Sequence, residues 1–130
     1  MKFLLFPLLL LCTASLPAQT VPVNSHQSAM QLRDLCKDFV APTPFEHPLN
    51  AGLCAGYVQG AVDGFYLALT RGWVPTSEKA CILKQATMEE LVRVILKFID
   101  NHPEQLSYSA ADVAWDAMTA AYPCPAKTSP

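Results

Sequence analysis

Cysteine has the widest chemical range of the residues in this chain, because a thiolate can attack a carbon atom, bind a metal ion or form a disulfide. The sequence holds five cysteines. One, Cys12, lies in the first segment of the chain, and the others are Cys36, Cys54, Cys81 and Cys124. Which chemistry these four follow depends on the compartment that the protein reaches.

The first 18 residues indicate export. Lys2 precedes an apolar run from Phe3 to Leu11, and small residues follow as far as Ala18. The run is too short for a transmembrane helix, which needs about 20 apolar residues. We therefore predict a secretory signal peptide, residues 1–18, and a mature domain, residues 19–130, without a membrane span. An even number of cysteines in a small exported domain predicts two disulfides and leaves no free thiol for catalysis.

The other chemically active residue types do not form a recognisable catalytic or metal-binding pattern. His26, His47 and His102 are scattered over three segments, which does not match metal-ligand spacing. Asp63 is the single acid in an apolar stretch, and no second carboxylate lies at helical spacing for acid–base work. We interpret it either as a hydrogen-bonding residue that meets a neighbouring loop or helix end, or as a contact at a protein interface. We expect no enzyme activity, no cofactor and no metal.

Length and charge set the broad class. The chain has 130 residues with 9 basic and 11 acidic side chains, a net charge of −2. That length is typical of a single domain. A weakly acidic balance without a basic cluster argues against a nucleic-acid partner, and it is compatible with a basic protein partner.

Apolar residues recur with helical period in four segments, and alternation typical of strands is absent. We predict an all-α fold, a small four-helix bundle. The expected helices cover residues 24–39, 50–70, 87–100 and 110–121. The expected N-caps are Asn24 or Ser25, then Asn50, then Thr87 with a capping box to Glu90, and Ser109 with a capping box to Asp112.

Three disulfide pairings are possible for four cysteines, and the helix layout favours one of them. Cys36 lies near the end of the first expected helix and Cys54 near the start of the second. A hairpin of the third and fourth helices would bring Cys124 back to Cys81. The favoured pairs are Cys36–Cys54 and Cys81–Cys124, each closing the foot of an antiparallel helix pair.

The second expected helix carries glycine at every fourth position. Gly52, Gly56, Gly60 and Gly64 form one slowly drifting stripe. Glycine inside a helix costs about 1 kcal/mol relative to alanine, and close approach of another backbone usually offsets this cost. We expect Gly56, Gly60 and Gly64, with Asp63 beside them, to pack against a second helix of this chain or against a partner protein.

Several short motifs together resemble one known family. The stretch Cys54-Ala55-Gly56-Tyr57-Val58-Gln59-Gly60-Ala61-Val62-Asp63-Gly64 resembles the C-x-G-Y-V-x-G-x-x-D-G core of the Rap/Tai family of type VI secretion immunity proteins. Cys81-Ile82, Thr87, His102-Pro103-Glu104 and Tyr122-Pro123-Cys124 resemble further family motifs in the same order. Lys84 and the lack of a proline after Ile82 depart from the family pattern.

The resemblance implies a periplasmic helical protein, often dimeric, that blocks a secreted peptidoglycan amidase and so protects the producing cell. The expected partners are therefore the amidase effector and a second copy of the chain. Blocking by occlusion suits a projecting loop. We expect residues 101–109 to contact the effector, with His102, Pro103 and Glu104 at the turn and Tyr108 as an aromatic anchor. The alternative contact is the loop at residues 71–84, which carries Trp73.

Two other classes of function compete with this interpretation. The first is a periplasmic chaperone or stress protein of the acid-resistance type, also a small helical bundle held by disulfides. Three histidines and the lack of rich acidic clusters make it less attractive. The second is a small wall-modifying enzyme, which would need a polar catalytic cluster that the sequence does not supply.

Overall fold

The structure is a computed structural model that describes residues 26–43, 46–75, 79–82 and 85–125. Its elements are α1 (Ala29–Cys36), α2 (Pro48–Thr70), α3 (Met88–Asn101), the 3-10 helix η2 (Pro103–Gln105) and α4 (Ala110–Ala121). The described residues form no named strand, so the predicted all-α fold is confirmed. The expected signal peptide and Cys12 lie outside the described residues.

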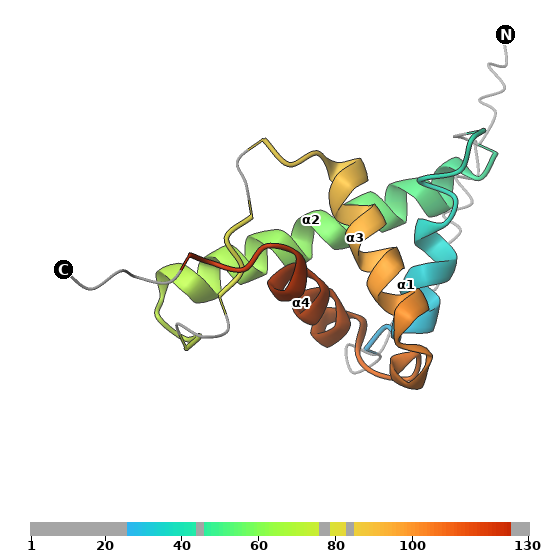
Figure 1. The fold of residues 1–130 in the computed structure, drawn as a ribbon. Helices are drawn as coiled ribbons and strands as arrows, with labels where there is room; N and C mark the ends of the chain where they lie inside the picture. Colours follow the sequence, from blue (N-terminus) through green and yellow to red (C-terminus); the bar gives the residue numbers. More distant parts are fainter. Residues whose placement is uncertain (1–25, 44–45, 76–78, 83–84, 126–130) are drawn as a thin grey trace, which may run out of the picture.

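Helix α2 is the longest element, and the three shorter helices lie along one side of it (Figure 1). It contacts α1, α3 and α4. Only Cys54 and Val58 of its 23 residues are buried, because its opposite side faces solvent. The fold therefore uses one side of α2 for packing and leaves the other side exposed.

The core lies where α1, α3 and α4 meet the inner side of α2. Its largest fully buried side chains include Leu32 of α1, Ile95 and Ile99 of α3, and Met118 of α4. Helix α4 also contributes three alanines, Ala110, Ala114 and Ala117, which let α3 and α4 approach closely. Burial of this apolar surface supplies the main driving force for folding.

Two disulfides join the ends of neighbouring elements, as the helix layout predicted. Cys36 at the end of α1 pairs with Cys54 in the first half of α2, and the two Cα atoms are 4.9 Å apart. Cys81 pairs with Cys124, again with 4.9 Å between the Cα atoms. The backbone supports the second bridge, because the Cys81 amide donates to the Tyr122 carbonyl at 2.7 Å.

Helix starts follow local chemistry in two cases. Ser28 caps α1 in a capping box with Gln31, so the expected cap at Asn24 or Ser25 is wrong. The box of Thr87 with Glu90 at the start of α3 is confirmed.

The predicted cap of α2 is wrong, whereas Ser109 is confirmed as the N-cap of α4 without the predicted capping box to Asp112. Helix α2 begins at Pro48, in the first helical turn, where the missing N–H of proline is tolerated. Asn50 instead donates a hydrogen bond from Nδ2 to Asp38 Oδ2 at 2.7 Å. Ser109 occupies the N-cap position of α4, but its side chain makes no cap hydrogen bond, and its backbone forms an isolated bridge with Ser28.

Candidate functional site

The turn between α3 and α4 is fixed to the start of α1 by backbone hydrogen bonds. The amide of Ala29 donates to the Tyr108 carbonyl at 2.9 Å, and that of Met30 donates to the Leu106 carbonyl at 3.0 Å. The Ala110 amide donates to the Gln27 backbone carbonyl at 2.7 Å. These bonds use the free N–H groups of two helix starts. The turn is therefore a rigid feature of the surface.

Of the four predicted contact residues in this turn, one side chain faces the protein and three face solvent. His102 stacks on Phe98, with ring centroids 4.0 Å apart and planes at 21°. Its Nδ1 lies 2.8 Å from the Phe98 carbonyl oxygen. Pro103 and Glu104 are exposed, and Tyr108 is 55% exposed. Among the predicted contact residues of the turn, His102 thus supports the structure while the other three are available to a partner.

The glycine stripe lies on the exposed side of α2. A Cβ atom placed on Gly56, Gly60 or Gly64 would meet no described atom within 4 Å beyond the local helix backbone. A shallow groove follows the stripe, and Ala111 of α4 forms part of its wall. Leu53 and Leu67 are 51% and 47% exposed, and helical projection places them on the same side of α2 as the glycines. No described helix therefore packs closely against the stripe, and the other expected packing partner, a partner protein, stays a prediction.

Asp63 also lies on the exposed side of α2. Its described side-chain hydrogen bond is within the helix, where Gln59 Nε2 donates to Asp63 Oδ1 at 3.0 Å. The interpretation of Asp63 as a contact to a neighbouring loop or helix end therefore finds no support among the described residues. Its position suits the alternative interpretation, an interface contact.

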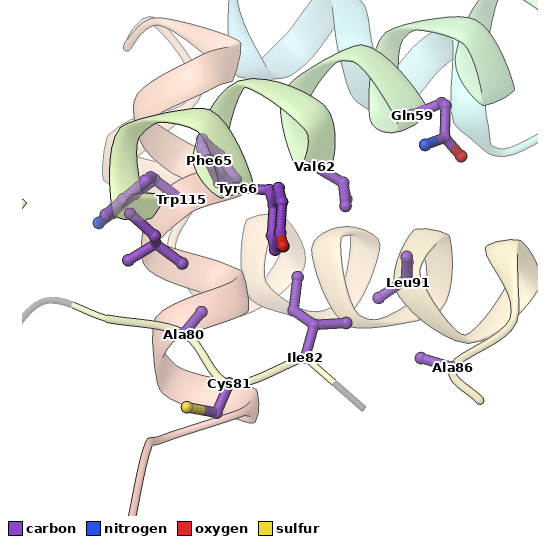
Figure 2. Close-up of a pocket in the computed structure, with 11 residues that line it drawn as sticks. Gln59, Val62, Phe65, Tyr66, Ala80, Cys81, Ile82, Ala86, Leu91 and Trp115 are labelled. Atoms are coloured by element: carbon purple, nitrogen blue, oxygen red, sulfur yellow. The ribbon is translucent and has the colours of Figure 1, made fainter. Parts of the chain in front are cut away.

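A pocket of about 500 Å³ opens beside α2, on the side that carries Gln59, Val62 and Tyr66. Figure 2 shows it between α2 and the segment of residues 80–82, with Trp115 of α4 at one end and Gln59 at the other. Phe65 meets Trp115 edge to face in its wall. Its lining side chains are mostly apolar: Val62, Phe65, Tyr66, Leu69, Ala80, Ile82, Ala86, Leu91 and Trp115.

Exposed aromatic side chains gather at the C-terminal end of α2. Tyr66 and Trp73 are each 70% exposed. Gly72 adopts a φ of 69°, a conformation that favours glycine, and it lets the Trp73 amide donate back to Ala68 at 3.0 Å. Trp73 is thus held close to the helix end on the surface, where aromatic side chains often anchor protein interfaces.

The sequence singled out Trp73 but missed the pocket and Tyr66. Helical projection places Tyr66 on the same side of α2 as Gln59 and Asp63. The sequence alone could therefore have identified an exposed aromatic side chain near Asp63. The pocket itself had no local signal, because its walls come from four separate segments of the chain.

Two partly buried tyrosines of the described residues have raised pKa values. Burial raises the pKa of the Tyr57 hydroxyl, and the Asp112 carboxylate raises it further. Burial also raises the pKa of the Tyr122 hydroxyl, and the Glu90 carboxylate raises it further. Both hydroxyls therefore stay protonated at neutral pH. The described residues contain no cluster of three His, Cys, Asp or Glu side chains suited to a metal ion, and none of their helices has the length and apolar character to cross a membrane.

Comparison with known proteins identifies a family. A family model described as Rap1a immunity proteins matches residues 28–124. No curated protein and no solved structure matches the chain. The matched region begins at the N-cap of α1 and ends at the second disulfide, so it includes all four helices.

Proposed function

Because the chain belongs to the Rap1a immunity protein family, we propose that it protects the cell that makes it by binding and blocking a secreted type VI effector. The family match carries this proposal, since it extends over the whole described bundle. The predicted effector is a peptidoglycan amidase, and the predicted site of action is the periplasm. Two disulfides are compatible with such an oxidising compartment.

The described surface supports binding to another protein. Exposed aromatic residues and methionine are enriched at protein interfaces. Here Tyr66, Trp73 and Tyr108 are exposed on rigid elements, and Met30 is exposed beside the Tyr108 turn. Such side chains lose little conformational freedom on binding when the backbone that carries them is already fixed.

The blocking step is occlusion, without chemistry by this chain. The turn of residues 102–109 is stiffened by Pro103 and by its hydrogen bonds to α1. Inserted into the groove of the amidase, it would exclude the wall peptide from the catalytic residues there. Tyr108 would supply the apolar contact and Glu104 a negative charge. Trp73 lies on the other candidate surface, at the end of α2.

A second copy of the chain is proposed to cover the groove on α2. An interface with twofold symmetry must be complementary to itself. The exposed face of α2 meets this condition about Gly60, because Leu53 and Leu67 lie equally far from it, as do Gly56 and Gly64. An antiparallel pair crossing at Gly60 would set each Leu53 against Leu67 of the second copy. The glycines would let the two backbones approach closely.

A binding assay coupled to a hydrolysis assay tests the proposed function. The oxidised chain, residues 19–130, is mixed with purified candidate secreted amidases, binding is measured by calorimetry, and hydrolysis of purified peptidoglycan is followed. The proposal predicts a stable complex and a loss of hydrolysis in proportion to the complex formed. Undiminished hydrolysis at a saturating concentration of the chain would refute the proposed function. An amidase from an unrelated system serves as the control and should stay active.

A further inference from the structure

The pocket beside α2 has one wall that is held in place by covalent and hydrogen bonds. Residues 80–82 form this wall opposite Phe65 and Tyr66 (Figure 2). Ala80 pairs with Pro123 as an isolated bridge, and Cys81 is joined to Cys124. The Cys81 amide also donates to Tyr122. The wall is therefore anchored to the end of α4, and the pocket exists before any partner arrives.

The size and lining of the pocket indicate an apolar occupant. Its volume of about 500 Å³ falls in the range of sites that enclose small ligands or single anchoring groups. Val62, Phe65 and Ile82 present hydrocarbon and aromatic surface, and Gln59 is the amide at one end. An aliphatic or aromatic group would displace water from these side chains, which is favourable in proportion to the apolar area covered.

The entrance of the pocket is wide and aromatic, which favours a side chain of a protein over a free small molecule. Tyr66 lines the pocket and yet is 70% exposed. A small-molecule site usually buries most of its ligand. Here the Tyr66 side of the entrance would remain exposed to water with a small molecule bound. The surface of a partner protein would cover Tyr66 at the entrance and exclude that water, as happens around the central contacts of protein interfaces.

A carboxylate adjoins the Gln59 end of the pocket. Gln59 donates to Asp63, and Asp63 is the one charged residue within α2. Lys79 precedes Ala80 in the sequence, and Ala80 lies toward the Trp115 end of the pocket, away from Gln59 (Figure 2). A cationic group near Gln59 would therefore find a carboxylate that has no cation paired with it among the described residues.

We propose that this pocket receives one aliphatic or aromatic side chain of the effector, and that a lysine or arginine beside that side chain pairs with Asp63. The inference rests on the proposed function, because it takes the effector as the occupant. It adds a second contact to the Tyr108 turn and states the chemistry of the effector segment that fits.

A titration with short peptides tests the chemical preference without the effector. Acetyl-Arg-Phe-Arg-amide, acetyl-Glu-Phe-Glu-amide and acetyl-Arg-Gly-Arg-amide are added to the isotope-labelled, oxidised mature chain, and amide resonances are followed by NMR. The first peptide should shift the signals of Tyr66, Ile82 and Trp115. The acidic and the glycine peptides should bind at least about threefold more weakly, because each lacks one of the two complementary groups.

Variants at the pocket test the effector as the occupant. Tyr66→Ala removes the exposed side chain at the entrance, and Ala86→Leu fills part of the cavity from a half-buried position. Each should weaken effector binding by about tenfold. Asp63→Asn should weaken it by about threefold at low salt, with a smaller difference at high salt. Leu49→Ala and Asp100→Asn, exposed positions on other parts of the surface, are the matched controls and should leave affinity unchanged.

The outcomes separate the two proposals. If the effector binds Tyr66→Ala, Ala86→Leu and Asp63→Asn as tightly as the parent chain, the pocket proposal is wrong while the immunity function stands. If the first peptide enters the pocket and the effector does not bind the parent chain, the proposed function fails and the effector is excluded as occupant. Peptide shifts confined to residues outside the pocket would also overturn the inference.

Discussion

Phe65 of α2 meets Trp115 of α4 edge to face, with ring centroids 4.4 Å apart and ring planes at 87°. Aromatic pairs in this geometry contribute about 0.5–1.5 kcal/mol beyond their buried area. The pair joins the C-terminal half of α2 to α4, at the place where the bundle has no buried residue of α2.

We expect Phe65→Ala to lower the free energy of unfolding by about 2 kcal/mol, less than for a fully buried phenylalanine because Phe65 is half-buried. Urea unfolding followed by tryptophan fluorescence measures this. Leu49→Ala, at an exposed site on the same helix, is the control and should change stability by less than about 0.5 kcal/mol. Equal effects of the two variants would mean that the ring pair does not stabilise the bundle.

The two disulfides should differ in how readily they are reduced. Cys36 and Cys54 are fully buried, whereas Cys81 is exposed. A thiol reductant must reach a sulfur atom, so mild reductant should open Cys81–Cys124 first. Trapping of free thiols with iodoacetamide followed by peptide mass spectrometry checks the order. Simultaneous labelling of all four cysteines would contradict it.

The four helices and both disulfides could be predicted because their signals are local or follow from helix order. Apolar residues repeat in each helix, and the Thr87–Glu90 box lies within one turn. The pairing of cysteines needed only the antiparallel arrangement of neighbouring helices. The helices thus follow from residues close in sequence, and the disulfide pairs follow from the order of the helices.

Other features depended on contacts between distant segments and could not be predicted. Asn50 is a good N-cap residue, yet Asp38 engages its amide across the connection of α1 and α2, and Pro48 starts the helix earlier. The exposure of the glycine stripe depends on which side of α2 the other helices cover. The pocket depends on residues 80–82 being drawn to α4. Each of these features depends on tertiary contacts between segments that are distant in the sequence.

The capping box of α3 should make its stability sensitive to acid. Two hydrogen bonds from Thr87, first from its backbone amide and then from its hydroxyl, hold the pKa of Glu90 below the ordinary value of 4.5. A folded-state pKa that lies below the unfolded one stabilises the folded chain above the unfolded value, and the effect is lost as pH falls through the folded value. Glu90→Gln should therefore lower stability at about pH 6 and have little effect at about pH 3.

Chemical denaturation at the two pH values checks this expectation. Thr87→Ala removes the hydroxyl cap and should cost about 1 kcal/mol. It should also reduce the part of the Glu90 effect that depends on pH. An effect of Glu90→Gln that is the same at both pH values would show that its charge is not the cause.

The exposed stripe predicts opposite effects for two glycine substitutions. Gly60→Ala should stabilise the separated chain by about 1 kcal/mol, because alanine is the better helix former and the Cβ has open space. Gly72→Ala should destabilise it by about 1 kcal/mol, because its φ of 69° disfavours a side chain. Thermal unfolding of dilute samples measures both.

The same stripe gives a test of self-association. Gly60→Leu places a bulky side chain at the crossing point of the proposed pair of α2 helices, while in a single chain it would point into solvent. Sedimentation should find the parent chain dimeric and Gly60→Leu monomeric with its helical content intact. A monomeric parent chain at high concentration, or a dimer that tolerates Gly60→Leu, would exclude this interface.

The turn that we propose to enter the effector contains residues with separable roles. Tyr108 is exposed, so Tyr108→Ala should weaken effector binding by about tenfold or more and leave the unfolding free energy within about 0.5 kcal/mol. His102 packs on Phe98 and lies within hydrogen-bond distance of its carbonyl, so His102→Ala should mainly lower stability. Trp73→Ala, on the other candidate surface, distinguishes the two loops: if it abolishes inhibition of wall hydrolysis while Tyr108→Ala does not, the chain engages its effector through the end of α2. Binding by calorimetry and unfolding in urea, measured on the same preparations, separate a lost contact from a lost fold.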